Sequence, residues 1–313
     1  MIIHKSYITI LIFISLIELM NQTYIIVRLI YINLKMVPQH ILFRGFAHGM
    51  YAQYVILLGM LHLYETGQYT GVNVDMKPGL LYTDPTINSN WWLNYFEPIK
   101  VGDVTTPPKQ YLDTEFIGPF LISEKTLTRA QNNDLIEKYI HLNPKMTQVL
   151  GNFTEKHFGD TDYIIGVHYR GLEKKIDAVI LPFENYSDKV KGIIQGLGPE
   201  VKYKIFVATD VYGFLEHMKA VFGDRIVSYN KSCRSKDGNP HYKNWGPGYS
   251  TTPCEWATPY YFGESAVMDC YVLALTDILI RSDSNLSLTS TFINPDLNVI
   301  KMTHRFASQS NGN

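Results

Sequence analysis

The second half of the chain alternates short apolar runs with stretches that have the apolar spacing of amphipathic helices. The apolar runs predict strands at residues 162–168, 202–209, 225–229, 277–281 and 297–301. The amphipathic stretches predict helices at residues 183–195, 211–221, 263–276 and 286–293. Strands that alternate with helices in this way predict an α/β fold with a parallel, doubly wound sheet.

The first half opens with a similar unit. A strand is predicted at residues 40–44, a helix at 50–65 and a second strand at 69–75, with Gly45 and Gly49 in the turn before the helix. A glycine turn at this place suits either a bound phosphate or a close approach of the backbone. Gly45 is therefore a candidate binding residue, although the sequence lacks the G-x-G-x-x-G spacing of dinucleotide sites.

An almost continuous apolar run at residues 7–20 sets residues 1–35 apart as an N-terminal segment. The run is short for a membrane span and has the length of a signal-peptide core. Three interpretations stay open: a signal anchor that tethers the protein to a membrane in the Golgi or secretory lumen, an extension before Met36 that the fold does not need, and a packed helix of the fold. Without an anchor, the expected location is the cytoplasm.

Charge and cysteine content narrow the functions that fit this chain. It has 28 basic and 29 acidic residues, a net charge of -1, and no block of Lys and Arg. It therefore lacks the positive field with which many proteins attract nucleic acids, and no nucleic-acid partner is expected. The three cysteines, Cys233, Cys254 and Cys270, show no C-x-x-C spacing, so neither a disulfide framework nor a zinc site is indicated.

Polar side chains follow the predicted strands of the second half where each strand ends. Because the carboxyl ends of parallel strands share one edge of a sheet, where α/β proteins bind ligands, these side chains are expected to lie together. They are His168, Arg170, Thr209, Asp210, Ser282, Ser284 and Asn285. A guanidinium can bind two phosphate oxygens at once, and serine hydroxyls with the amides of a helix start complete an anion site. The edge therefore predicts a site for a phosphorylated ligand.

Asp269 is a further candidate because it stands in an apolar helical pattern, with Val267 and Met268 before it and Tyr271 and Val272 after it. Aspartate is a poor helix former and is costly to bury without a partner. Two interpretations stay open. The carboxylate either has a structural task, such as capping a turn or binding a lysine, or it faces the ligand and accepts the N–H groups of a guanine edge.

These residues resemble the motifs of a known family. Residues 168–174, His-Tyr-Arg-Gly-Leu-Glu-Lys, are similar to the H-V-R-x-T-D-K motif of the GDP-fucose-dependent fucosyltransferases, which include the α-1,6-fucosyltransferases, the nodulation-factor enzymes and the protein O-fucosyltransferases. Residues 206–210, 263–269 and 277–285 resemble later motifs of that family in order and spacing. The resemblance covers roughly residues 160–300.

The resemblance implies a GT-B fold, in which two Rossmann-like domains face each other across a cleft. Residues 36–159 are then expected to form the acceptor-side domain, residues 160–303 the domain that binds the GDP-sugar, and residues 304–313 a tail. The implied reaction is an inverting transfer of fucose from GDP-fucose to a hydroxyl of a glycan or protein, with no metal and no cofactor.

The resemblance also assigns roles to single residues. Arg170 is expected on the β-phosphate, His168 and Asp269 on the guanine, and Ser284 and Asn285 on the diphosphate. In place of a metal ion, a fixed arginine stabilises the charge that develops on the departing GDP. The expected donor-binding set is His168, Arg170, Asp210, Asp269, Ser284, Asn285 and Gly45.

The motif departs from the family where the acceptor is activated. Leu172 replaces the family's threonine, and Ala178 stands where the α-1,6 enzymes carry a glutamate that is the proposed base. Asp177, one residue earlier, is the expected replacement, with Lys174 and Glu173 assisting the deprotonation of the acceptor hydroxyl. Two alternative functions stay open: a protein that binds a nucleotide sugar without catalysis, and a transferase that uses another GDP-sugar.

Overall fold

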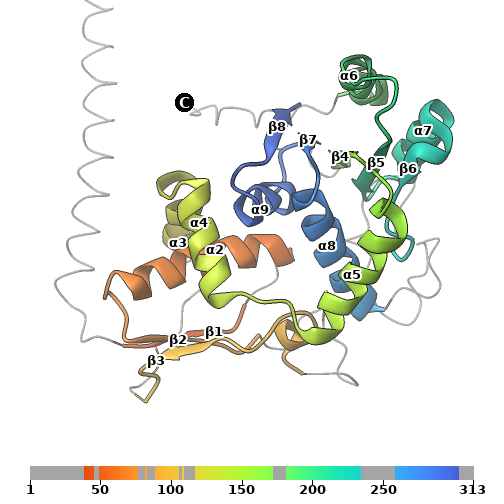
Figure 1. The fold of residues 1–313 in the computed structure, drawn as a ribbon. Helices are drawn as coiled ribbons and strands as arrows, with labels where there is room; N and C mark the ends of the chain where they lie inside the picture. The colour runs from red at the N-terminus through yellow and green to blue at the C-terminus, as the bar shows by residue number, and fades with distance from the viewer. Residues whose placement is uncertain are drawn as a thin grey trace, which may run out of the picture.

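In the part of the chain that the structure describes, two β-sheets carry the fold (Figure 1). The computed structural model describes residues 39–45, 49–76, 82, 89–105, 108, 117–171, 181–232, 234 and 258–302. The larger sheet contains β4 (Tyr163–Tyr169), β5 (Tyr203–Thr209), β6 (Ile226–Val227), β7 (Ile278–Arg281) and β8 (Asn298–Lys301). The smaller sheet contains β1 (Ile41–Phe43), β2 (Gly71–Val74) and β3 (Lys100–Gly102).

The larger sheet has the strand order β6–β5–β4–β7–β8, and all its neighbouring strands are parallel. Its helices are α5 (Pro144–Phe158), α6 (Phe183–Gln195), α7 (Tyr212–Phe222), α8 (Pro259–Ala274) and α9 (Asn285–Ile293), with the short turn η5 (Gly223–Arg225) before β6. The predicted α/β fold class is confirmed. Most bounds differ by one or two residues. The larger differences are that β6 is shorter than predicted and that α8 begins earlier, where the side chain of Thr258 caps it and Pro259 occupies its first turn.

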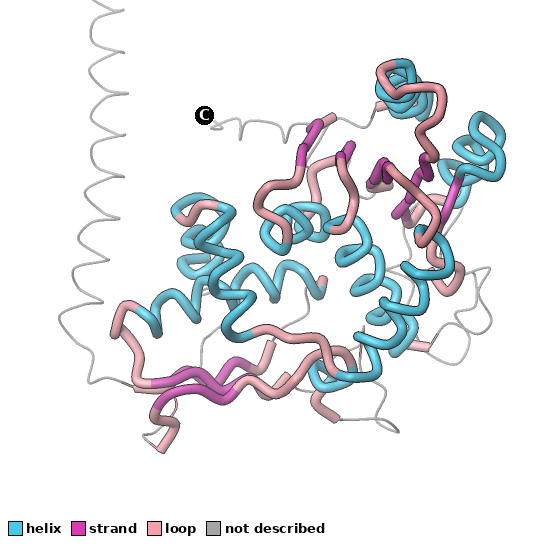
Figure 2. Tube along the Cα trace, in the orientation of Figure 1, coloured by secondary structure: helices cyan, strands magenta, loops and turns pink. Residues whose placement is uncertain are grey.

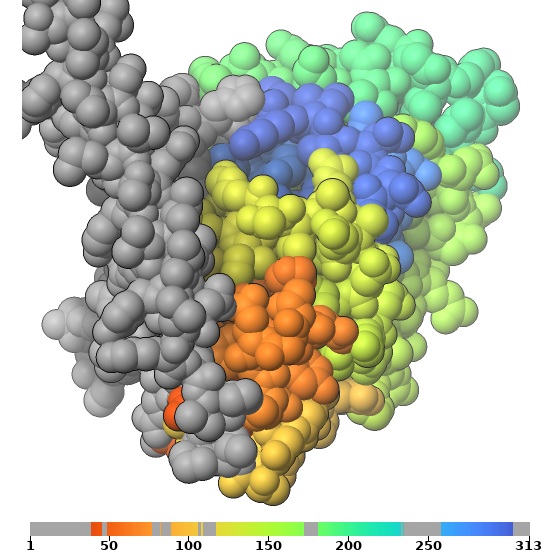
Figure 3. Space-filling model, turned by 90° about the vertical axis from the view of Figure 1, so that its left-hand side faces the viewer, coloured from red at the N-terminus to blue at the C-terminus, as the bar shows by residue number. Residues whose placement is uncertain are grey.

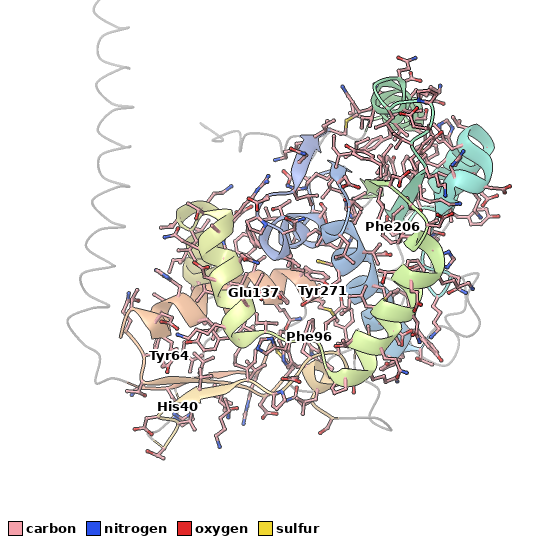
Figure 4. The ribbon with its side chains drawn as sticks, viewed as in Figure 1. His40, Tyr64, Phe96, Glu137, Phe206 and Tyr271 are labelled. Atoms are coloured by element: carbon pink, nitrogen blue, oxygen red, sulfur yellow. The ribbon has the colours of Figure 1, made fainter. Side chains whose placement is uncertain are left out.

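Alternation along the central strands assigns the helices to the two faces of the larger sheet. Ile205 and Val207 of β5 are buried in one cluster with α6 and α7, whereas Phe206 and Ala208 are buried in another with α5 and α8. Figure 2 shows the two groups of helices on opposite sides of the sheet, and Figure 4 shows Phe206 on the side of α5 and α8. The three larger side chains, Ile205, Phe206 and Val207, each contribute about 1.5–3 kcal/mol to stability through the burial of their apolar surface.

The smaller sheet belongs to the first half of the chain. β1 and β2 are parallel, β3 is antiparallel to β2, and α2 (Met50–Glu65) connects β1 to β2, as the sequence predicts. α2 is buried on all sides along most of its length, which explains why its sequence is apolar without a polar face. Around it lie η1 (Trp91–Asn94), α3 (Ile117–Leu121), η3 (Ile122–Thr126) and α4 (Arg129–Tyr139).

The two halves share one continuous hydrophobic core, which runs from β1 and α2 to α8 and α9. α2, α4 and α9 pack against one another, and Figure 3 shows their orange, yellow and blue surfaces side by side on one face. Two hydrogen bonds reinforce this contact: Asn133 donates to the carbonyl of Ile293 at 3.0 Å, and Arg129 donates to the carbonyl of Leu297 at 3.1 Å. The arrangement of two sheets is consistent with the expected GT-B architecture, and the domain boundary near residue 160 stays a prediction.

The N-terminal segment at residues 1–35, with its apolar run at 7–20, lies outside the described residues, as does the tail at 304–313. Among the described helices, none combines the length and the apolar character that a membrane span requires. The membrane tether therefore stays a prediction.

Gly263 is required where α8 meets the first half. A Cβ atom at this position would lie 2.2 Å from the ring of Tyr95, which is fully buried and donates a hydrogen bond of 2.8 Å to the carbonyl of Tyr260. We expect Gly263→Ala to lower the free energy of unfolding, because overpacking a rigid contact costs about 1–3 kcal/mol and exceeds the gain of about 1 kcal/mol in helix propensity. Urea unfolding measures the difference.

Gly192→Ala on α6 is the matched control, because a Cβ atom there meets no heavy atom within 4 Å. We expect this variant to be more stable than the parent by about 0.5–1 kcal/mol. Equal effects of the two substitutions would contradict the close packing of Tyr95 against α8.

Candidate functional site

The carboxyl ends of β4, β5 and β7 meet at one edge of the larger sheet. Tyr169 of β4 is aligned with Thr209 of β5, and His168 is aligned with Arg281 of β7. The residues that follow these positions therefore lie side by side, as the sequence predicts for a parallel sheet. Parallel strands of α/β proteins bind their ligands at such an edge.

Arg170 and Asp210 form an ion pair at this edge. Nη1 of Arg170 lies 3.0 Å from Oδ2 of Asp210, and the amide of Gly171 donates to Oδ1 of Asp210 at 3.0 Å. Burial raises the pKa of Asp210, and the positive charge of Arg170 opposes that shift. Asp210 thus contacts both the side chain of Arg170 and the backbone amide of the next residue, Gly171.

Ser282, directly after β7, holds the backbone of the same arginine. Its hydroxyl accepts a hydrogen bond of 2.9 Å from the amide of Arg170 and donates to His168, whose carbonyl oxygen and Nδ1 both lie at 3.2 Å. The amide of Ser282 donates to the same carbonyl at 3.0 Å. Ser282 therefore ties the end of β7 to the end of β4 and fixes where the Arg170 side chain begins.

His168 is a neutral group at this site. It is buried, and burial together with the positive charges of Arg170 and Arg281 lowers its pKa to about 3. A histidine with this pKa carries no charge near neutral pH. It can act as a hydrogen-bonding group toward a ligand, but it neither attracts nor repels an anion by its own charge.

Ser284 and Asn285 lie at the start of α9, on the same edge. Ser284 caps the helix, because its hydroxyl accepts a hydrogen bond of 3.3 Å from the amide of Leu286. The buried guanidinium of Arg281 fixes this turn by donating to the carbonyl of Ser284 at 3.1 Å and to the hydroxyl of Ser287 at 3.0 Å. The amides and partial positive charge of a helix start suit an anion, in agreement with the predicted anion site.

Asp269 joins the cluster from α8. It is buried, and burial raises its pKa to about 7, while the positive charge of Arg234 lowers it and the negative charge of Asp210 raises it further. The hydroxyl of Ser232 lies 3.5 Å from Oδ1 of Asp269. Asp269 thus lies close enough to Asp210, the partner of Arg170, for the two carboxylate charges to interact, and a ligand site shared by Asp269 and Arg170 stays a prediction.

Sequence reasoning missed Arg234, which is buried beside these carboxylates. Its guanidinium donates to the carbonyls of Ser232 at 3.1 Å and Tyr229 at 3.3 Å. It comes from a polar stretch with glycine and proline that shows no periodic pattern. The sequence offered one signal for Arg234, namely that it follows a predicted strand by a few residues. That signal alone does not show that Arg234 lies beside Asp269 of α8.

The first half of the chain reaches the site through Tyr82, which the sequence also gave no reason to select. Its hydroxyl accepts a hydrogen bond of 3.0 Å from the amide of Met50 at the start of α2. Burial raises the pKa of Tyr82, and the charge of Arg170 lowers it, so the tyrosine lies within the electrostatic reach of the arginine. The start of α2 therefore faces the edge that carries Arg170.

Gly45 occupies a turn with a left-handed backbone that favours glycine. Its φ is +66°, and a Cβ atom would lie 2.3 Å from Oε1 of Gln53 and 2.8 Å from Sδ of Met76. Of the two interpretations of this glycine, a close approach within the fold is the one for which the structure gives a reason. Its contact with a donor stays a prediction.

The residues expected to activate the acceptor, Glu173, Lys174 and Asp177, lie outside the described residues, and so do Cys233 and Cys254. Among the residues that the structure does describe, no group of three or more His, Cys, Asp or Glu side chains could hold a metal ion. The reaction without a metal stays a prediction.

Comparison with known proteins finds solved structures with a similar fold. No protein-family model and no curated protein sequence matches the chain. Among solved structures, NodZ α-1,6-fucosyltransferase soaked with GDP-fucose matches 82% of this chain and 93% of its own, with a TM-score of 0.54 and 16% sequence identity. This likeness shows a shared fold. NodZ from Bradyrhizobium gives a TM-score of 0.53 at 16% identity, over 86% of this chain and 99% of its own.

A further structure of NodZ, co-crystallised with GDP, has a TM-score of 0.53 and 15% identity over 86% of this chain and 99% of its own. The expected similarity to the GDP-fucose-dependent fucosyltransferases is thus confirmed for the fold, over nearly the whole length of NodZ. The identity is low, so the roles of single residues depend on the geometry of this chain.

The raised pKa of Asp269 makes stability depend on pH. Folding shifts this pKa from 3.8 to about 7, so the folded protein takes up a proton more readily than the unfolded chain does. The contribution of Asp269 to the free energy of unfolding therefore rises as the pH falls from 7 toward 4, by about 1.4 kcal/mol per pH unit, and is lost as the pH rises through 7. We expect Asp269→Asn to remove this part of the pH dependence.

Urea unfolding between pH 5 and pH 8 tests the prediction, with the parent protein as the reference. Asp160→Asn is the control, because the Asp160 side chain is 89% exposed. Parallel pH profiles for the parent and Asp269→Asn would show that the burial of this carboxylate is not coupled to its protonation.

Proposed function

We propose that this protein is a glycosyltransferase that moves fucose from GDP-fucose to a hydroxyl of a glycan or protein. One observation carries the proposal: a largely buried arginine is fixed by Asp210 and Ser282 at the sheet edge where α/β proteins bind ligands. The fold shared with NodZ, a protein described as an α-1,6-fucosyltransferase soaked with GDP-fucose, supports the same reaction.

Arg170 is proposed to stabilise the leaving group. When the sugar–phosphate bond breaks, negative charge develops on the β-phosphate of GDP, and a guanidinium is well suited to bind two of its oxygens. The contact with Asp210 and the backbone bond to Ser282 orient Arg170 before the donor arrives. A donor group that is already oriented pays little reorganisation energy in the transition state, and for this reason no metal ion is proposed.

The remaining donor contacts follow from the positions of the cluster. The ionised carboxylate of Asp269 is proposed to accept the two N–H groups of the guanine edge, with neutral His168 as a further hydrogen-bonding group. The start of α9, with Ser284 and Asn285, is proposed to bind the diphosphate. Guanine recognition and phosphate binding then use neighbouring strand and helix ends.

The acceptor is proposed to react by direct displacement with inversion. Its hydroxyl oxygen forms a bond to the anomeric carbon on the face opposite the diphosphate, the bond from that carbon to the β-phosphate oxygen breaks, and the hydroxyl proton passes to a carboxylate. Asp177 is the proposed base, with Lys174 and Glu173 assisting it. These three assignments rest on the sequence motif alone.

Replacement of Arg170 tests the reaction. We expect Arg170→Ala to lower the rate of GDP release from GDP-fucose about 100-fold or more, because loss of one oriented donor to a developing anion has that effect in other enzymes. Arg170→Lys keeps the charge without the two-pronged geometry and is expected to recover part of the rate. Arg225→Ala is the control, since Arg225 is exposed and contacts Tyr203 instead of the site.

The same assay separates the alternatives. Binding of GDP without turnover on any member of a panel of glycan and protein acceptors would favour a non-catalytic nucleotide-sugar-binding protein. Faster turnover of another GDP-sugar than of GDP-fucose would replace fucose as the transferred group. Undiminished GDP release by Arg170→Ala would remove the basis of the proposal.

Replacement of Ser282 tests how the arginine is held. Ser282→Ala leaves the part-buried amide of Arg170 without its acceptor, which costs up to about 1–3 kcal/mol of stability and loosens the arginine. We expect a smaller increase in melting temperature on addition of GDP than the parent protein shows. Thermal unfolding with and without GDP measures this difference.

Ser187→Ala is the matched control for Ser282→Ala. Ser187 is also buried, and its hydroxyl donates to the carbonyl of Glu184 and lies 3.2 Å from Nε2 of His217, neither of which belongs to the candidate site. We expect this variant to lose stability and to keep the full GDP-induced increase. The hypothesis fails if both variants respond to GDP as the parent does.

A further inference from the structure

The chain that follows β6 is anchored to α8 by Glu264. We call the described residues 229–232 and 234 the post-β6 segment. The carboxylate of Glu264, which is 1% exposed, accepts hydrogen bonds from the hydroxyl of Tyr229 at 2.6 Å and from Nζ of Lys231 at 2.8 Å. A buried carboxylate requires such partners, and here both come from a segment more than thirty residues away in the sequence.

Arg234 is folded back onto the same segment. Its Nη1 donates to the carbonyl of Ser232 and its Nη2 to the carbonyl of Tyr229, so the guanidinium is held by the turn that Glu264 anchors. Its charge acts on both buried carboxylates of the site, since it lowers the pKa of Asp269 and of Asp210. Asp210 thus lies under the influence of two arginines, Arg170 and Arg234, and Asp269 under that of Arg234.

We propose that Arg234 is a positioning residue for base recognition. Its charge favours the ionised form of Asp269, and its hydrogen bond to the carbonyl of Ser232 holds the residue whose hydroxyl contacts Asp269, so that a guanine edge can donate two hydrogen bonds to the carboxylate. Glu264 is the anchor that keeps Arg234 in place. This inference rests on the proposed function, because it takes a guanine nucleotide as the ligand.

The chemistry of the carboxyl group explains why the charge of Arg234 matters. An ionised carboxylate accepts hydrogen bonds with both oxygens and therefore matches the N1–H and the exocyclic amino group of guanine. A protonated carboxyl group carries an O–H donor and no longer matches two donors. Without Arg234, the positive charge of Arg170, which pairs with Asp210, would remain at the site. The repulsion between Asp210 and Asp269 would then be less compensated, and Asp269 would bind a proton more readily.

The pH dependence of binding follows from the groups around Asp269. The charges of Arg234 and Asp210 shift the pKa of Asp269. The charge of Asp269 in turn raises the pKa of Tyr229 and of Cys270. Because the pKa of Asp269 is about 7, GDP affinity is expected to be full at higher pH and to fall as the pH decreases through 7. Loss of the positive charge of Arg234 moves this fall to higher pH.

Binding of GDP and of inosine diphosphate tests the inference, because inosine lacks the exocyclic amino group of guanine. Isothermal titration calorimetry between pH 6 and pH 9 is carried out with the parent, Arg234→Gln and Arg234→Lys. We expect Arg234→Gln to bind GDP about tenfold more weakly at pH 7, to lose its preference for GDP over inosine diphosphate, and to recover affinity toward pH 9. Arg234→Lys keeps the charge and is expected to keep the pH profile of the parent.

Arg225→Gln is the matched control, because it removes an exposed arginine next to β6 that contacts Tyr203. It is expected to bind both nucleotides as the parent does. The inference is overturned if Arg234→Gln keeps the parent's preference and pH profile, or if it loses affinity equally at every pH, which indicates a structural role alone.

Two further outcomes are decisive. If Arg234→Gln does not fold, Glu264→Gln decides, since it weakens the anchor of the post-β6 segment and changes neither Arg234 nor Asp269. A fall in GDP affinity that moves to higher pH supports the inference, and an unchanged pH profile overturns it. If the parent protein binds neither nucleotide, the proposed function fails together with the inference, whereas normal binding by the parent and by all variants overturns the inference alone.

Discussion

The buried ion pair between Arg170 and Asp210 is the interaction on which the candidate site depends. Charges removed from water are tolerated where opposite charges and hydrogen bonds compensate them. The sheet edge provides both, because the amide of Gly171 and the hydroxyl of Ser282 meet the two residues there. Each partner stands at the end of a different strand, so the register of β4, β5 and β7 sets the geometry of the pair.

α8 extends this arrangement toward the centre of the molecule. It buries two acidic residues, Glu264 and Asp269, in an otherwise apolar helix. The two have different surroundings, since Glu264 accepts two short hydrogen bonds, whereas Asp269 has a hydroxyl at 3.5 Å and a pKa raised by burial. An acid that is well paired serves the fold, and one that is poorly paired and beside other charges suits ligand binding.

The parts of this site that the sequence predicted follow from local patterns. Apolar runs located β4, β5 and β7, and the parallel sheet then brought His168, Arg170 and Asp210 together. Arg234 and Tyr82 could not be predicted, because each is placed by contacts between distant segments: Tyr82 meets Met50 across 32 positions, and the segment of Arg234 is placed by Glu264. Gly45 was ambiguous because a tight turn and a phosphate site share the same residue type.

The continuous core has a consequence for how the molecule denatures. Two domains with separate cores commonly melt in separate steps, whereas elements that bury one another lose their structure together. Here α2, α4 and α9 pack against one another, and Tyr95 of the first half packs against Gly263 of α8. The helices of this shared core, α2, α4, α5, α8 and α9, thus form one cooperative unit, and we expect them to unfold in a single calorimetric transition.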